Sequence, residues 1–284
     1  MKIKQLFFIF LFIPLLFIAS ELSAGIEIKK GDRIAFFGDD VTAQGNLETG
    51  FIHFVTMALH ENGINIVKIP AGTLGYKSSD LLAQLQKNVL NHKPQILILN
   101  CGVSDVRIGK RTPLEKFKQN VTQIVEKAQA AKVKVYILTA TMLSENVNNK
   151  PNRRLQPYND FLRQLAKDKN CVLVDLYNDM LQTQNQIRKV YPGHKSYILT
   201  YDGVHMNPLG NIVIARSLLK AFGLNEEQLA IGSANWIQRR CIIGEYAVNL
   251  SLWEYLKLSE KAFAARTDVP NFIRYLVNRK LKEK

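Results

Sequence analysis

Residues 33–45 read RIAFFGDDVTAQG, a short apolar run that ends in a Gly-Asp-Asp turn. Similar β-rich apolar runs recur between helical patterns, at residues 64–69, 95–100, 134–139 and 171–175. Strands that alternate with helices favour a parallel sheet with helices on both faces. The sequence therefore predicts an α/β fold, a flavodoxin-like doubly wound parallel sheet of five strands in the order 2-1-3-4-5.

Helical patterns fill the intervals between the predicted strands. Residues 112–115, Thr-Pro-Leu-Glu, have the pattern of a capping box with proline at the first helical position. Asn207 and Pro208 predict the start of a last core helix that runs to about Phe222 and stops at Gly223. The apolar residues that repeat at helical spacing are expected to form the core.

Polar motifs follow two of the predicted strands at their carboxyl ends. Gly38 to Asp40 follow the first strand, and the stretch ILNCGVSDV at residues 98–106 carries Ser104 past the third. In the predicted strand order these two strands flank the switch point where ligands bind. The two motifs are therefore expected to meet in space.

Two further blocks complete the pattern. AGTLGYKSSD at residues 71–80 contains Gly75, and YDGVHMNPLGN at residues 201–211 contains Asp202 and His205 just before a helix start. An Asp-x-x-His spacing lets a carboxylate orient an imidazole that serves a nucleophile as general base.

These four blocks resemble the GDSL or SGNH hydrolase family, whose members usually carry Gly-Asp-Ser, a lone Gly, Gly-x-Asn-Asp and Asp-x-x-His in this order. The resemblance covers about residues 31–223. It implies that Asp202 and His205 are the acid and the base of a serine esterase. It also implies that the backbone N–H of Gly75 donates to the oxyanion.

The chain departs from the family pattern at two catalytic positions. Asp40 stands where the nucleophilic serine belongs, and Ser104 stands where the oxyanion-hole asparagine belongs. An anionic Asp40 beside His205 would favour the imidazolium and would repel a tetrahedral oxyanion. Losing one oxyanion donor costs about 10² to 10³ in rate, and losing a triad nucleophile costs about 10⁶. Ordinary serine-esterase turnover is therefore not expected.

Three hypotheses follow for the function. The first is a secreted SGNH/GDSL esterase-like protein, resembling carbohydrate O-acetylesterases or acylhydrolases, with lost or strongly reduced activity and a retained ligand pocket. The alternative is an active ester hydrolase with altered chemistry that uses Asp40 with His205 and Asp202. A metal cluster of the same three residues ranks lowest, because no ligand-spacing motif supports it, and no cofactor is predicted. The expected ligand is a small acylated molecule or an acetylated polysaccharide.

The N-terminus has the pattern of a targeting segment. Lys2 and Lys4 precede an apolar run over residues 6–19, which ends in the small residues of Leu22-Ser23-Ala24. This pattern predicts that residues 1–24 are a cleaved signal peptide and that the protein is secreted or periplasmic. An uncleaved membrane anchor is the competing interpretation.

Charge and composition change after Gly223. We predict a domain over residues 26–223 and a basic helical extension over residues 224–284, which lacks strand signals. The formal net charge of the chain is +14. For an exported protein this charge favours an anionic envelope surface, contacted by the basic extension, over nucleic acid. A solubilising charge with no specific partner is the alternative.

The number and spacing of the cysteines do not indicate a particular structural role. Cys101, Cys171 and Cys241 are odd in number and have no CxxC spacing, so neither a disulfide scaffold nor a zinc site is indicated. One pair could still bridge in an oxidising compartment, and the sequence leaves open which.

Overall fold

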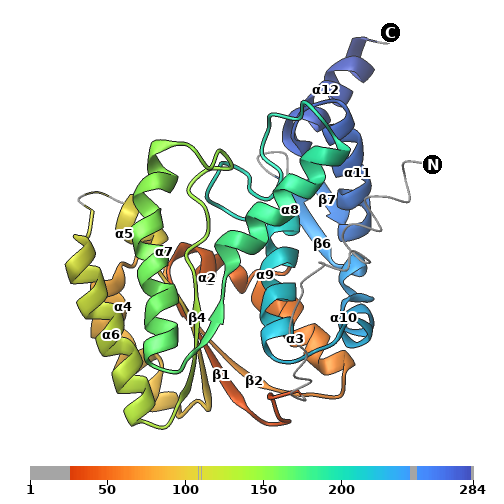
Figure 1. The fold of residues 1–284 in the computed structure, drawn as a ribbon. Coiled ribbons are helices and arrows are strands. Elements are labelled where there is room, and N and C mark those ends of the chain that lie inside the picture. Colours follow the sequence, from red (N-terminus) through yellow and green to blue (C-terminus); the bar gives the residue numbers. More distant parts are fainter. Residues whose placement is uncertain (1–25, 108, 110, 244–247, 283–284) are drawn as a thin grey trace.

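The computed structural model describes residues 26–107, 109, 111–243 and 248–282 (Figure 1). The predicted signal peptide lies outside these residues. Within them, no helix is long and apolar enough to cross a membrane. Figure 1 shows a central sheet covered by helices on both faces, with a C-terminal extension beside it.

The central sheet has five parallel strands in the order β2-β1-β3-β4-β5, which confirms the predicted topology. The strands are β1 Arg33–Gly38, β2 Val67–Gly72, β3 Ile96–Asn100, β4 Lys134–Leu138 and β5 Val172–Val174. β3 is buried along its whole length, as expected of a central strand covered on both faces.

The second strand begins later than predicted. It spans Val67–Gly72 rather than residues 64–69, and it therefore includes Pro70. Proline has no N–H to donate to a ladder, so a sheet tolerates it on an edge strand. β2 is an edge strand, because it pairs only with β1. The edge position of β2 in the strand order is what permits Pro70 here.

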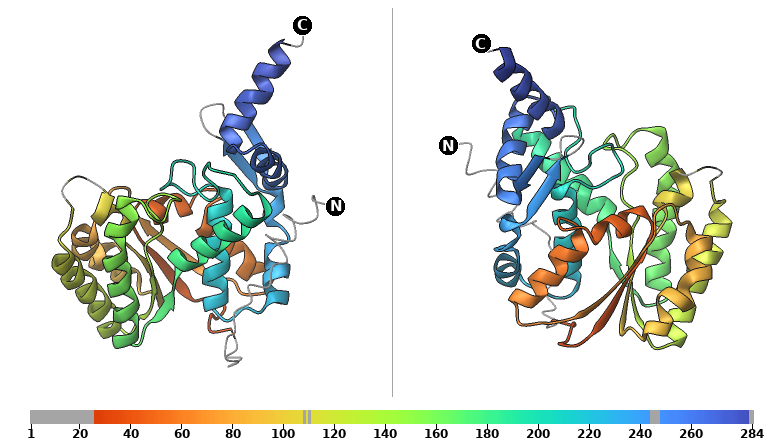
Figure 2. Two further views of the ribbon diagram at one scale, coloured as in Figure 1. Left: turned by 45° about the horizontal axis from the view of Figure 1, so that its top comes forward. Right: turned by 180° about the vertical axis from the view of Figure 1, so that it is seen from behind.

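Helices cover both faces of the sheet. α4, α6 and α7 lie on one face, and α3, α8 and α9 lie on the other (Figures 1 and 2). The helices of this part are α2 Asp40–Gly45, α3 Phe51–Glu61, α4 Ser78–Asn88, α5 Val103–Arg107, α6 Leu114–Ala130, α7 Lys150–Asp168, α8 Leu176–Val190 and α9 Pro208–Ala221, with a 3-10 turn at Leu90–His92.

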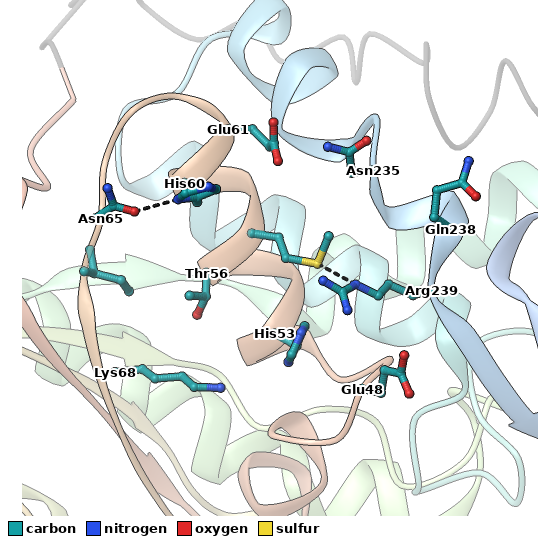
Figure 3. Close-up of a pocket in the computed structure, with 12 residues that line it drawn as sticks. Glu48, His53, Thr56, His60, Glu61, Asn65, Lys68, Asn235, Gln238 and Arg239 are labelled. Carbon is teal, nitrogen blue, oxygen red and sulfur yellow. Dashed lines mark hydrogen bonds between the residues drawn. The ribbon is translucent and has the colours of Figure 1, made fainter.

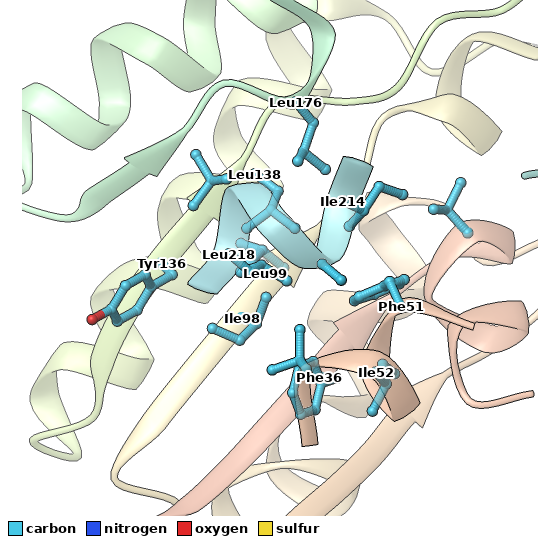
Figure 4. Packing of buried hydrophobic residues seen from close by; sticks show 14 of the residues in the cluster. Phe36, Phe51, Ile52, Ile98, Leu99, Tyr136, Leu138, Leu176, Ile214 and Leu218 are labelled. Atoms are coloured by element: carbon cyan, nitrogen blue, oxygen red, sulfur yellow. The ribbon is translucent and has the colours of Figure 1, made fainter. Parts of the chain in front are cut away.

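Apolar side chains pack the strands against α3, α8 and α9. Figure 4 shows aromatic and branched side chains of the two layers in contact, among them Phe36 of β1, Phe51 of α3 and Ile214 of α9. All three are 1% exposed or less. Burying a side chain of this size stabilises a fold by about 1.5–3 kcal/mol, so this layer holds the strand ends in place.

Two predicted helix starts differ in outcome. Asn207 caps α9 as predicted, because its side chain accepts a hydrogen bond from the N–H of Gly210. The predicted capping box at residues 112–115 is wrong, since α6 begins at Leu114 without a side-chain cap. Thr112 instead bonds Asp105, through both its backbone N–H and its side chain. A tertiary partner has thus replaced the local one.

The strand register brings the polar motifs together. Gly38 at the end of β1 lies opposite Gly72 of β2 and Asn100 of β3. The three loops that follow these strands therefore begin side by side at one edge of the sheet. A Cβ on Gly38 would lie 2.2 Å from the carbonyl oxygen of Asn100, so glycine is required for this close approach.

The extension contains more than the predicted helices. It includes a two-stranded antiparallel sheet, and its elements are α10 Glu226–Ser233, a 3-10 turn at Trp236–Gln238, β6 Arg240–Ile243, β7 Val248–Ser251, α11 Leu252–Ala264 and α12 Val269–Lys282. These strands have only four residues each, too few for a periodic pattern to distinguish them from loop. α12 projects away from the rest of the molecule (Figure 2). A contact of this basic helix with an anionic envelope surface remains a prediction.

Aromatic side chains are among the groups that pack the extension on the core. Trp236 stacks on Phe54 of α3, with ring centroids 4.9 Å apart, and its indole N–H donates to the carbonyl oxygen of Phe54 at 3.1 Å. Further along, Phe263 of α11 contacts the rings of Tyr191 and His194. Cys101 and Cys171 are both free thiols, so no disulfide joins them.

Candidate active site

Asp40 is the first residue of α2, directly after the turn that follows β1. Its side chain is turned inward, and the residue is only 5% exposed. Its Oδ1 accepts a hydrogen bond from the backbone N–H of Gly75 at 2.9 Å. Its Oδ2 accepts one from the hydroxyl of Ser104 at 2.8 Å. The residue at the predicted nucleophile position therefore occupies both groups predicted to donate to an oxyanion.

Gly75 adopts a backbone conformation that suits glycine. Its φ is +77°, in the left-handed region, although a Cβ there would meet nothing within 4 Å. Conformation rather than space thus requires glycine at this position. In this conformation the N–H of Gly75 points at the carboxylate of Asp40.

Arg107 is a site residue that the sequence analysis missed. Its Nη2 lies 3.4 Å from Oδ2 of Asp40, and its side chain is 35% exposed. It lies one helical turn beyond Ser104 on α5, so both residues share one face of that helix. The spacing of three residues between Ser104 and Arg107 is the sequence feature that could have identified Arg107. The cation faces Asp40 from the side that the solvent reaches.

Asp39 stabilises the turn between β1 and α2 through hydrogen bonds. It caps α2 through a bond from the N–H of Val41, and it also accepts the backbone N–H of Ser104. Burial raises the pKa of Asp39 to about 7, and the nearby charges of Asp40 and Asp105 act in the same direction, against the hydrogen bonds from Ser104 and Val41. This carboxyl group therefore takes up a proton near neutral pH.

The raised pKa of Asp39 predicts a pH-dependent stability. Between the unfolded value of 3.8 and about 7, the folded chain holds a proton that the unfolded chain has released. The free energy of unfolding must then fall as the pH rises through this window, and level off above it. We expect Asp39→Asn, which does not titrate, to flatten the fall in melting temperature between pH 5 and 7.5.

Thermal melts followed by circular dichroism across this pH range measure the effect. Asp160→Asn, on the exposed surface of α7, is the matched control and should keep the wild-type slope. Equal slopes for Asp39→Asn and wild type would contradict the assignment.

Asp105 binds the start of α4 to this site. Its carboxylate accepts both the N–H and the hydroxyl of Ser78, and Asn120 donates to the same hydroxyl. Ser78 is therefore committed to a buried structural network. It is not available as a substitute nucleophile.

Asp202 and His205 form the predicted pair in the loop before α9. Nδ1 of His205 lies 2.6 Å from Oδ2 of Asp202, and the N–H groups of His205 and Val204 donate to Oδ1. Burial acts to raise the pKa of Asp202, but the hydrogen bonds from His205 and Val204 and the imidazole lower it overall. Asp202 thus remains ionised and orients the ring. Asn211 anchors this region by accepting the N–H of Phe51 at the start of α3.

Asp40 and His205 do not contact each other directly, and the predicted effect of Asp40 on the charge of His205 stays a prediction. Among the described residues, neither an ion pair nor a hydrogen bond joins the two side chains, and Nε2 of His205 has no hydrogen-bond partner. The reason is that Gly75, Ser104 and Arg107 already engage both oxygens of Asp40. His205 is left with an acceptor or donor nitrogen for a ligand.

Glu145 positions the Asp202 and His205 loop from beneath. It lies in the connection after β4 and is 2% exposed. Its carboxylate accepts three consecutive backbone N–H groups, those of residues 198, 199 and 200, at 2.7–2.8 Å, and the hydroxyl of Thr200. That hydroxyl in turn accepts the N–H of Gly203. The sequence analysis missed Glu145, because its partners lie 39 to 55 residues away along the chain.

The described part of the chain does not provide a set of side chains that could coordinate a metal ion. No group of three or more His, Cys, Asp or Glu side chains is arranged there to hold an ion. The site instead provides the imidazole of His205, oriented by Asp202, and the carboxylate of Asp40, which accepts hydrogen bonds from three groups.

Comparison with known proteins identifies the family to which this fold belongs. Residues 36–212 match the model of the GDSL-like Lipase/Acylhydrolase family. The chain belongs to this family. The match begins in β1 and ends within α9, so it includes every residue of the site described above.

Two relatives are named as acetylxylan esterases. One is from Geobacillus stearothermophilus and is 24% identical over 224 residues, which are 70% of this chain and 97% of that protein. The other is the solved structure of AlAXEase, an acetyl xylan esterase that is 30% identical, with a TM-score of 0.62, covering 66% of this chain and 98% of its own. An uncharacterized lipoprotein of Bacillus subtilis is 24% identical, covering 70% of this chain and 93% of that protein.

Proposed function

We propose that this chain is an exported member of the GDSL-like family that has lost serine-esterase catalysis and keeps its site as a ligand pocket for an acylated carbohydrate. One observation carries the proposal, namely the carboxylate of Asp40 bound to Gly75 and Ser104. The same two donors would have to stabilise the oxyanion of an ester-hydrolysing intermediate.

The loss of catalysis follows from the occupancy of these donors. Acyl transfer needs a nucleophile at residue 40 and free donors for the oxygen that becomes negative. Asp40 removes the hydroxyl nucleophile and places its own negative charge against the donors. A substrate carbonyl would have to displace a carboxylate that is already bound by three groups.

The alternative, a hydrolase in which Asp40 attacks or holds a water, needs a free carboxylate oxygen. Both oxygens are engaged, and Oδ2 also faces Arg107. An attacking Asp40 would break these bonds before reaching a substrate. This mechanism is therefore the less favoured one, and it is an outcome that the experiment distinguishes.

The ligand class comes from the relatives. Two of them are named as acetylxylan esterases, which supports an acetylated polysaccharide. At the site, the unbonded Nε2 of His205 and the part-exposed guanidinium of Arg107 remain for polar contacts with such a ligand.

We expect wild type to bind an acetylated xylo-oligosaccharide without releasing acetate. Isothermal titration measures the binding, and an acetate assay on the same mixture measures hydrolysis. The deacetylated oligosaccharide is the ligand control, and His205→Ala is the site control that should weaken binding. Acetate release by wild type that Asp40→Asn abolishes would reject the proposal in favour of the carboxylate mechanism. Equal binding of both oligosaccharides would reject the acetyl-specific pocket.

Export is the part of the proposal that rests on the N-terminal sequence, supported by a relative that is named as a lipoprotein. The mature chain is then expected to begin near Gly25. Intact-mass measurement of protein from the native envelope or medium tests this, and a chain that still carries Met1 to Ala24 would contradict it.

A further inference from the structure

A cleft of about 580 Å³ lies apart from the residues of the candidate active site. The exposed face of α3 forms one wall, the edge strand β2 forms a second, and the start of the extension forms the third (Figure 3). A volume of this size is ample for a small-molecule ligand.

Two cations from different walls enter this cleft. Lys68 comes from β2, and Arg239 follows the 3-10 turn of the extension (Figure 3). Neither forms an ion pair with any residue of the described ranges. Lys68 donates only to the side-chain oxygen of Asn46, and Nε of Arg239 points at the sulfur of Met57. The terminal nitrogens of Arg239 have no partner among the described residues.

His53 of α3 lies between these two cations, and their positive charges affect its pKa. Burial lowers its pKa, and the charges of Arg239 and then Lys68 lower it further, while the carboxylate of Glu48 acts in the opposite direction. The other titratable groups in the cleft are His60, which bonds Asn65, and Glu61, the last residue of α3. Both positive charges therefore act at one point inside the cleft.

The third wall lies beyond the part of the chain that matches the family. The family match ends at residue 212, and Gln238 and Arg239 come after it. Trp236 holds this wall in place by stacking on Phe54. The cleft is thus formed by docking of the extension, and it does not belong to the active site.

We propose that this cleft is a second ligand site, which binds a carboxylate or phosphate group between Lys68 and Arg239. The planar fork of a guanidinium suits an oxyanion with two acceptor oxygens, and an ammonium adds a point charge from the opposite wall. Glu48 and Glu61, the two carboxylates of the lining, oppose the binding of an anion, but among the described residues neither forms an ion pair with Lys68 or Arg239. The bound anion stabilises the protonated form of His53.

Proton NMR of the full chain tests the site, with the His53 ring signals assigned by His53→Gln. Sodium phosphate and sodium acetate are the probes, titrated separately at constant ionic strength against sodium chloride. We expect a saturable shift of the His53 signals and a rise in its pKa. Saturation by phosphate alone or by acetate alone supports the site and identifies which oxyanion it takes.

Variants that remove one charge from the cleft should change its affinity for the anion in opposite directions, depending on the sign of the charge removed. Lys68→Gln and Arg239→Gln should each weaken binding by about tenfold, which is the loss of one charge-assisted contact. Glu48→Gln should strengthen it, and Lys87→Gln, on the exposed side of α4, should leave it unchanged. Circular dichroism confirms that each variant is folded. A linear response to both probes, or folded Lys68 and Arg239 variants that bind like wild type, would overturn the proposal.

Discussion

The double variant Asp40→Ser/Ser104→Asn should hydrolyse p-nitrophenyl acetate at least about 10³-fold faster than wild type, because it restores a nucleophile and an oxyanion donor together. Asp40→Ser removes the carboxylate that occupies the N–H of Gly75 and supplies a hydroxyl in its place. Ser104→Asn supplies a longer side chain with an N–H donor. His205, held by Asp202, is then the base.

The two changes act as one unit, so each single variant should recover little. Asp40→Ser alone still lacks one donor, which is worth about 10² to 10³ in rate. Ser104→Asn alone still faces the carboxylate of Asp40 and has no hydroxyl nucleophile. Addition of His205→Ala to the double variant is the control that should abolish the gained activity.

Covalent labelling distinguishes a restored site from a nonspecific gain. A serine-directed fluorophosphonate should label residue 40 in the double variant and should leave wild type unlabelled. A folded double variant with neither labelling nor turnover would show that the pocket no longer supports esterase chemistry. It would then reject the explanation that Asp40 and Ser104 alone prevent catalysis.

The largest expected effect on stability is that of Glu145→Ala. Its removal leaves the N–H groups of residues 198–200 and the hydroxyl of Thr200 without their buried acceptor. An unsatisfied buried donor costs about 1–3 kcal/mol, and losses within one network are not additive, so we expect a decrease of about 3–5 kcal/mol in the free energy of unfolding.

Urea unfolding followed by fluorescence and circular dichroism measures this decrease. Glu115→Ala is the matched control, because that glutamate is exposed on α6 and pairs only with Lys118 in the described part of the chain. It should change the free energy of unfolding by at most about 0.5 kcal/mol. A Glu145→Ala variant as stable as the control would show that residues 198–200 find other acceptors.

The fold was predictable where short segments determine it. Alternating apolar runs and helical stripes indicate the five parallel strands, and their order follows from the doubly wound pattern. The Asp202 and His205 pair was equally visible, because its bonds join residues three apart in one loop. Asn207 belongs to the same class, since a helix cap binds within its own first turn.

Contacts between distant segments could not be predicted in the same way. The sequence identified Asp40, Gly75 and Ser104, but not that the first would bond the other two, which lie 35 and 64 residues further along the chain. Thr112 shows the same limit, because a buried partner in Asp105 replaced the predicted cap. The short β6 and β7 strands form only as a pair.

The amino-acid sequence by itself determined the sheet, the helix caps that close within one turn, and the aspartate at the nucleophile position. These features depend on residues a few positions apart, whose backbone preferences and side-chain periodicity are local. Only the tertiary structure decided which donors Asp40 occupies, that Glu145 holds the His205 loop, and that the extension forms a cleft with Lys68 and Arg239. Those contacts exist because packing of the sheet and helices brings distant segments into hydrogen-bonding range.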